Sequence, residues 1–210
     1  KEKRRQARQR NNYTRYLYHK EVAEYMEDPS QLCFADEAGQ DGRGSQRRRG
    51  WGPKGDDIII AEYLNRGKHI SVLALYGYEG FMAFDWKEGG YDGDAFLSAM
   101  ELTICPHLQR YVKGSPRPNS IFVLDNCPAH KKHEAELRAL VEGRYGAKLI
   151  FLAPYSPIDN PIEMGFNCFK ACWRRHGMWL TALPMHARIR LCLLSCYADA
   201  AIAAPHTYEA

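Results

Sequence analysis

No stretch of this 210-residue sequence reaches the ~20 consecutive apolar residues that a helix needs to span a bilayer. The first ten residues, KEKRRQARQR, are basic, but no apolar segment follows them, so the pattern of a secretory signal peptide is lacking too. The most apolar late segment, residues 191–204, contains Asp199 and predicts a packed helix. We therefore expect no membrane partner.

The cysteine count argues against a disulfide framework, because seven is an odd number and no secretory signal accompanies it. Four cysteines form two pairs with helical spacing, Cys168 with Cys172 and Cys192 with Cys196, and two histidines lie between the pairs. Zinc binding is one interpretation, but structural zinc ligands usually lie on tight turns rather than within helices. Thiols buried in a helical core are the other interpretation, and they fit the pattern better.

Net charge is small, +4, but the basic residues are concentrated in residues 1–10 and 47–54. Such clusters suit a polyanion such as nucleic acid, although a solvated helix or loop has the same composition. Trp51 either packs on a sugar or base, or fixes its glycine-flanked loop onto the protein. The candidate DNA contacts in the second cluster are Arg47, Arg48, Arg49, Trp51 and Lys54.

The chain begins with a pattern typical of a polar, basic helix over residues 1–27, in which Tyr16, Val22 and Tyr25 share one face. The motif Asp-Pro-Ser at 28–30 ends this helix. The run QLCFADEAG then predicts a buried strand that stops at Asp36.

The rest of the chain predicts an α/β fold. Strand-like runs joined by short turns favour antiparallel pairing, and a helix follows them. From residue 120 onward the order strand, helix, strand, helix predicts a parallel βαβ unit. We expect a mixed sheet, antiparallel hairpins plus parallel βαβ, flanked by helices. The antiparallel runs are 57–64, 68–77 and 81–89, and the helix that follows spans 92–108.

Acidic side chains end two of the predicted strands, Asp36 after LCFA and Asp125 after IFVL. Binding crevices form at the carboxyl ends of neighbouring strands in α/β sheets, although a turn or a helix cap also explains one such Asp. Glu163 lies in the first turn of a later helix, for which Asn160 is a good N-cap and Pro161 a good first residue.

That later helix has two stripes. Its apolar stripe consists of Ile162, Phe166, Phe169 and Trp173. The neighbouring polar stripe runs from Glu163 through Asn167 to two cations, Lys170 and Arg174. Such a line suits a metal at one end and phosphates along the rest, although an exposed amphipathic face has the same pattern.

Three carboxylates on rigid elements can hold two divalent cations about 4 Å apart. Oxygen ligands select Mg²⁺ or Mn²⁺. The predicted chemistry is in-line displacement at a phosphodiester, in which two ions assist the attacking and the leaving oxygen and no covalent protein intermediate forms.

Four motifs in order, FADEAG, RRRGWGPKG, VLDNCPAH and LAPYSPIDNPIE, resemble the catalytic domain of the mariner-like DDE transposases of the Tc–mariner superfamily. The resemblance covers residues 31–178 and implies a ribonuclease H-like fold with a metal-binding Asp, Asp, Glu triad. Matched motif by motif, the triad falls on Asp36, Asp125 and Glu163. Glu37 and Asp159 take non-catalytic positions in this match.

His130 matches a histidine that is frequent after the second Asp of the family. It either orients a carboxylate or contacts DNA, and a hydrogen-bond partner at a helix start is the alternative. The spacing departs slightly from many relatives, because 163 − 125 − 1 leaves 37 residues between the last two acids. The segment EGRYG at 142–146 can absorb this extra length.

The resemblance implies three parts: a basic helical linker or N-terminal arm (1–30), the ribonuclease H-like catalytic domain (31–180) and a C-terminal helix packed on it (181–210). The family usually carries helix-turn-helix modules before the catalytic domain, and none is recognisable in residues 1–30. Since the sequence also starts with Lys, we expect a fragment of a longer protein.

The expected function is that of a Mg²⁺- or Mn²⁺-dependent DNA endonuclease and strand transferase of a cut-and-paste transposon. Its partners would be transposon ends, target DNA and a second copy of the chain, in the nucleus if the source is a eukaryote and otherwise in the cytoplasm. A domesticated, catalytically silent DNA-binding protein is the main alternative. A ribonuclease or junction nuclease on the same fold fits the last motif less well.

Overall fold

The computed structural model describes residues 11–40, 55, 69–176 and 179–196. Five strands form one sheet in the order β3-β2-β1-β4-β5. β1 pairs antiparallel with β2 and parallel with β4, while β2–β3 is antiparallel and β4–β5 parallel, which confirms the predicted mixed sheet. The strands are β1 (Leu32–Gln40), β2 (Ile70–Gly77), β3 (Gly80–Glu88), β4 (Ile121–Leu124) and β5 (Lys148–Phe151).

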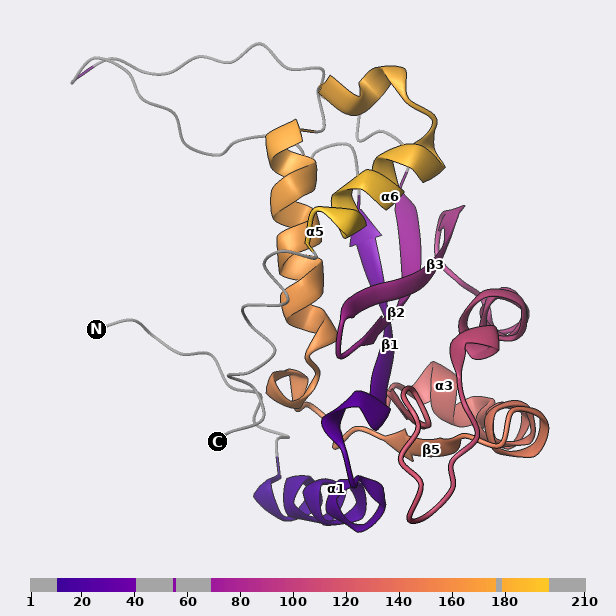
Figure 1. Ribbon diagram of the computed structural model, residues 1–210. Helices are drawn as coiled ribbons and strands as arrows, with labels where there is room; N and C mark the ends of the chain where they lie inside the picture. The colour runs from indigo at the N-terminus through magenta and orange to yellow at the C-terminus, as the bar shows by residue number, and fades with distance from the viewer. Residues whose placement is uncertain (1–10, 41–54, 56–68, 177–178, 197–210) are drawn as a thin grey trace.

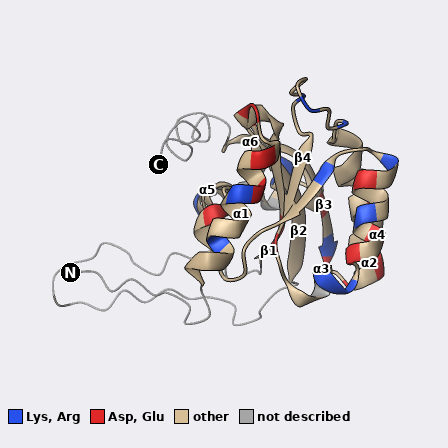
Figure 2. Ribbon diagram, turned by 90° about the horizontal axis from the view of Figure 1, so that it is seen from below, with Lys and Arg blue, Asp and Glu red and all other residues tan. Residues whose placement is uncertain are grey.

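Helices cover both faces of the sheet (Figures 1 and 2). One layer holds α1 (Asn12–Tyr25), α5 (Ile162–His176) and α6 (Met185–Leu194), and the other holds α2 (Gly93–Ala99), α3 (Pro128–Lys132) and α4 (Glu134–Arg138). Within the described ranges, no helix has the length and apolarity to cross a membrane. Short 3₁₀ or π turns occupy Pro29–Gln31, Met100–Ile104, Cys105–His107, Ala139–Arg144, Pro157–Asp159 and Trp179–Ala182.

The two layers bury two separate clusters, because successive strand residues point to opposite faces of the sheet. In β1, Leu32 and Phe34 belong to the cluster under α1, α5 and α6, while Cys33 and Ala35 belong to the cluster under α2 and α4. Asp36 is two residues after Phe34, so its side chain lies on the same face, which α5 covers. Glu37 is two residues after Ala35, so its side chain lies on the opposite face.

The prediction that the first strand stops at Asp36 is wrong, since β1 continues to Gln40. The reason is a change of partner along the strand. The parallel ladder with β4 ends at Ala35, but the antiparallel ladder with β2 runs on from Asp36 opposite Ala74 to Gln40 opposite Ile70. Asp36 thus lies inside a strand, at the point where one of its two neighbours ends.

The N-terminal helix is present as α1, but its predicted buried face is partly wrong. Tyr16 is 60% exposed, whereas Tyr18 is 7% exposed and packs with Val22 in the core. Tyr25 packs against the same cluster as predicted. Tyr18, Val22 and Tyr25 follow helical spacing, and only the contact with the sheet distinguishes this stripe from the neighbouring one.

Cys192 and Cys196 are buried in the core cluster of α5 and α6, as the buried-thiol interpretation predicts. Burial raises the pKa of the Cys192 thiol to about 12, and the neighbouring Cys172 thiol acts in the same direction. Among the residues that the structure describes, these cysteines do not form a group of three close metal-ligand atoms.

Some predictions fall on residues outside the described ranges. These are the strand at 57–64, the basic residues 1–10, and the DNA contacts Arg47, Arg48, Arg49, Trp51 and Lys54. The division into 1–30, 31–180 and 181–210 also stays a prediction, although α6 does pack against the core cluster of α5.

Candidate active site

Asp36 and Asp125 come together because β1 and β4 are neighbouring parallel strands. The last pair in their ladder is Ala35 with Leu124, so the next residue on each strand is an aspartate. Side chains alternate between the two faces of a sheet, so both aspartates lie on the same face as Phe34 and Val123, which is the face covered by α5.

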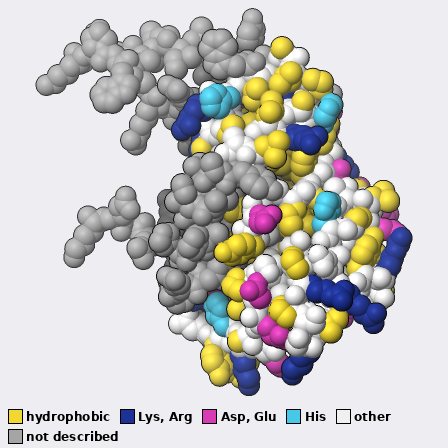
Figure 3. Space-filling view, viewed as in Figure 1, with side chains coloured by type: hydrophobic (Ala, Val, Ile, Leu, Met, Phe, Trp, Pro, Cys, Tyr) yellow, Lys and Arg dark blue, Asp and Glu magenta, His cyan; other side chains and the backbone are white. Residues whose placement is uncertain are grey.

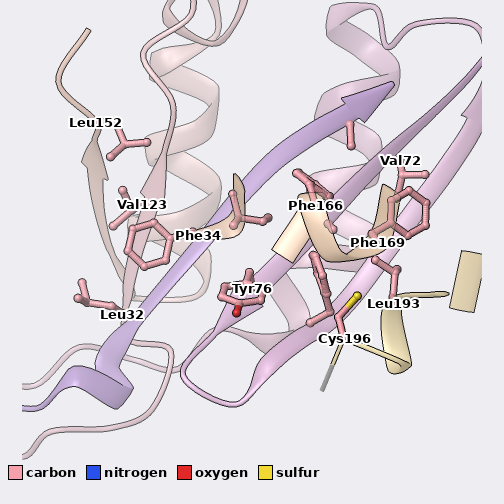
Figure 4. Packing of buried hydrophobic residues seen from close by; sticks show 14 of the residues in the cluster. Leu32, Phe34, Val72, Tyr76, Val123, Leu152, Phe166, Phe169, Leu193 and Cys196 are labelled. Atoms are coloured by element: carbon pink, nitrogen blue, oxygen red, sulfur yellow. The ribbon is translucent and has the colours of Figure 1, made fainter. Parts of the chain in front are cut away.

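Glu163 reaches the same place from α5, whose predicted apolar stripe is confirmed. Ile162, Phe166, Phe169 and Trp173 are all buried against the sheet. In Figure 4, Phe169 lies near Val72 and Leu193, and Phe166 belongs to the same buried cluster. This packing fixes the rotation of α5 about its axis. It leaves Glu163 half-buried near the carboxyl ends of the parallel strands.

Gly165 allows α5 to approach the sheet closely. A Cβ atom at this position would lie 2.8 Å from the Phe81 ring and 2.9 Å from the Tyr76 ring. Any larger residue here would require these rings or the first turn of α5 to shift, and that turn carries Glu163.

One pocket of about 340 Å³ is lined by Asp36, Asp125 and Glu163, so the structure brings the three predicted acids together. Asn126, Cys127 and Asn160 also line the pocket, and Pro128 with the segment 152–157 supplies the remainder. The pocket lies where the parallel strands end, as expected for binding crevices in α/β sheets.

The electrostatics of the pocket favour a cation. Burial raises the pKa of Asp36 to about 7. The backbone N–H of Glu37, 2.7 Å from Asp36 Oδ1, acts against this rise, while the negative charges of Asp125 and Glu163 add to it. Crowded carboxylates with hard oxygen donors are the ligand set that Mg²⁺ and Mn²⁺ prefer, so the residues present fit such an ion.

Asn160 is predicted as a helix cap, and its backbone carbonyl does accept a hydrogen bond from the Glu163 N–H at 3.1 Å. Its side chain does something else: Nδ2 donates to Asp36 Oδ2 at 2.8 Å. Asn160 is 4% exposed, and its Oδ1 is buried without a hydrogen-bond partner among the described residues. Asn160 therefore orients Asp36, a role that its place in the sequence did not indicate.

Asp159, next to Asn160, is held by α1. Arg15 donates from Nε to Oδ2 at 2.7 Å and from Nη2 to Oδ1 at 2.6 Å, and His19 Nε2 lies 3.5 Å from the same carboxylate. This two-point ion pair fastens the turn before α5 to the N-terminal helix. The partners are far apart in sequence, so no local pattern predicts the contact.

His130 contacts Asp125 through its Nδ1, facing Oδ1, and its Nε2 lies 3.9 Å from Glu37 Oε1. The ring is 5% exposed and stacks on Phe96, with centroids 4.3 Å apart. Burial lowers the pKa of His130, but the contacts with Asp125 and Glu37 outweigh burial and raise it to about 9. Of the predicted alternatives, the geometry favours a histidine that orients a carboxylate.

The other predicted phosphate contacts lie further along α5, where Lys170 is half-buried and Arg174 is exposed. The face shown in Figure 3 has acidic side chains near its middle and Lys and Arg mostly toward its edges.

Cys127, which follows Asp125 by two residues and lines the pocket, was not predicted as part of the site.

The sequence model described as DDE superfamily endonuclease matches residues 31–182. Among solved structures, the chain is similar to the Mos1 mariner paired end complex with Mn (TM-score 0.58, 14% identity, covering 97% of this chain and 66% of that one). It is also similar to the mariner Mos1 paired end complex with Mg, with a TM-score of 0.57 and 16% identity over 96% of this chain and 66% of that one. The Mos1 Strand Transfer Complex matches with a TM-score of 0.55 and 15% identity over 97% of this chain and 65% of that one. No curated protein matches the sequence.

These structural similarities show the fold, a mixed sheet of the ribonuclease H type. The chain spans only 65 to 66% of the length of those Mos1 chains. The family match covers most of the sequence and includes all three acids of the pocket. The chain belongs to the DDE superfamily endonucleases.

Proposed function

We propose that this chain is the catalytic domain of a mariner-type DNA transposase, which cuts and joins DNA with Mg²⁺ or Mn²⁺. The observation that carries the proposal is the meeting of Asp36, Asp125 and Glu163 in one pocket of a DDE superfamily chain. The similarity to Mos1 complexes, some with Mn or Mg, supports the choice of DNA and of a divalent ion.

In this proposal Asp36, Asp125 and Glu163 would together hold the divalent ions. Divalent ions at such a site supply Lewis acidity to the attacking hydroxyl and to the leaving 3′ oxygen. Asn160 and His130 keep Asp36 and Asp125 in position. Water attacks phosphorus and the bond from phosphorus to the 3′ oxygen breaks, which leaves a 3′ hydroxyl. This hydroxyl then attacks a phosphorus of target DNA, where the bond to the target's own 3′ oxygen breaks and that oxygen takes up a proton. No covalent bond to the protein is needed.

The partners in this proposal are transposon ends, target DNA and a second copy of the chain. The Mos1 paired end and strand transfer complexes support these partners by analogy of fold. A silent, domesticated DNA-binding protein is the second candidate, because an intact set of acids does not by itself prove cutting.

The test of the proposal is nicking of supercoiled plasmid with Mg²⁺ or Mn²⁺, compared between the chain and Asp125→Ala. We expect nicking that EDTA abolishes and that Asp125→Ala lacks. Nicking that survives the substitution would show that the activity comes from another site or a contaminant. DNA binding without nicking under either metal would favour the silent binding protein.

The predicted phosphate contacts on α5 give a separate expectation. A double substitution, Lys170→Ala with Arg174→Ala, should weaken binding to duplex DNA and reduce the slope of log affinity against log salt by about 1 for each lost phosphate contact. Fluorescence anisotropy at several salt concentrations measures this slope. Arg144→Ala is the control, because Arg144 is exposed and pairs with Glu101 in the layer of α2 and α4. If Arg144→Ala weakens DNA binding as much as the double substitution, the effect comes from net charge and not from phosphate contacts on α5.

A further inference from the structure

A different set of metal-ligand side chains lies where β4 leads into α3, and two of its three members line the pocket. The ligand atoms of Asp125, Cys127 and His130 all lie within 4.8 Å of one another. They offer oxygen, sulfur and nitrogen, the three donor types that hold zinc in proteins. Magnesium takes oxygen ligands, so this mixed group differs in chemistry from the three carboxylates.

The group is held rigidly. Cys127 directly precedes Pro128 at the start of α3, and His130 follows after two intervening residues, a spacing that zinc-ligand pairs use. The His130 ring is fixed by burial and by its stacking on Phe96. Its Nδ1 already faces Asp125 Oδ1, so an ion that takes both atoms as ligands replaces the hydrogen bond between them.

The residues around this group supply a carboxylate behind the histidine ring and open space for a further ligand. The second ring nitrogen of His130, Nε2, faces Glu37 Oε1 at 3.9 Å. A carboxylate in this position is the usual outer partner of a metal-bound histidine, since it fixes the tautomer and the ring orientation. Asp125 and Cys127 also line the open pocket, which leaves a place for a solvent molecule as the fourth ligand.

We infer that Asp125, Cys127 and His130 form a binding site for a thiophilic divalent cation such as Zn²⁺. The binding itself is independent of the proposed function. Its consequence rests on that function: an ion here uses Asp125, which is then withdrawn from the Mg²⁺ site, so zinc inhibits DNA cutting while magnesium supports it.

The test uses Cd²⁺ as the probe, with the whole chain and without DNA or Mg²⁺. Thiolate bound to Cd²⁺ gives an ultraviolet charge-transfer absorption that oxygen and nitrogen ligands do not give. We expect the band in the unsubstituted chain and in Cys172→Ser, a control thiol on α5, but not in Cys127→Ser. Zn²⁺ affinity, measured by competition with a chelating dye, should fall at least about tenfold in Cys127→Ser, the lower end of what loss of supporting ligands costs.

A band that persists in Cys127→Ser, or that is lost instead in Cys172→Ser, would overturn the inference, as would a folded parent chain that gives no band. Cys127→Ala replaces Cys127→Ser if the serine variant fails to fold. The two proposals fail separately. A chain that binds Cd²⁺ here but never nicks DNA refutes the proposed function alone, and a chain that nicks DNA but shows no band refutes this site alone.

Discussion

Glu163→Gln should reduce metal-dependent nicking more than about 100-fold, since loss of even a supporting metal partner costs 10- to 100-fold. The amide keeps the size and shape of the side chain but removes the negative charge that a divalent ion needs. Glu163 lies in the first turn of α5 and lines the pocket with Asp36 and Asp125. Rates of plasmid nicking under single-turnover conditions measure the loss.

The fold should survive this change. Glu163 also benefits from the positive end of α5, an interaction typically worth about 0.3–1 kcal/mol, so the thermal melt should move only slightly. Glu136→Gln is the matched control, because its side chain is 56% exposed and lies in the layer of α2 and α4. It should leave both nicking and melting unchanged. If Glu163→Gln unfolds the chain, the residue is structural and its assignment as a metal ligand is wrong.

Phe166→Ala should lower the free energy of unfolding by about 4 kcal/mol, as expected for a large aromatic side chain deleted from a packed core. Phe166 is 2% exposed, and its ring centroid lies 5.6 Å from that of Phe81. The loss combines apolar surface returned to water with a cavity between α5 and the sheet. Chemical denaturation followed by circular dichroism measures the change.

Met164→Ala is the control on the same helix, because Met164 is 47% exposed and two residues away. Its effect should stay within about 0.5 kcal/mol, as for most surface substitutions. A loss below about 1 kcal/mol for Phe166→Ala would mean that α5 is not seated as described, since even Ile→Val in a core typically costs 0.5–1.5 kcal/mol. The position of Glu163 would then need another explanation.

Local patterns predicted much of the site. An apolar run followed by an acid identified Asp36 and Asp125, although only Asp125 follows the end of its strand and Asp36 lies within β1. Helical spacing identified the buried stripe of α5 and with it the face that presents Glu163. These predictions depend on residues that are near neighbours in the sequence, and the mixed character of the sheet followed from the same runs.

The features that sequence patterns missed depend on distant partners. β1 extends beyond Asp36 only because β2 continues to pair with it. Tyr18 rather than Tyr16 is buried because of where α1 meets the sheet. The hydrogen bond from Asn160 to Asp36 joins residues 124 positions apart. The basic residues at 47–54 lie outside the described ranges, so their role in DNA binding stays a prediction.

The ion pair between Arg15 and Asp159 links the start of the chain mechanically to the acidic pocket. Asp159 is followed directly by Asn160, whose amide holds Asp36, so the ion pair, a short stretch of backbone and one hydrogen bond connect α1 to this carboxylate. Moving α1 away from the domain requires breaking this ion pair as well as the packing of Tyr18 and Val22 in the core. The Arg15–Asp159 ion pair thus ties the position of α1 to the turn that carries Asn160.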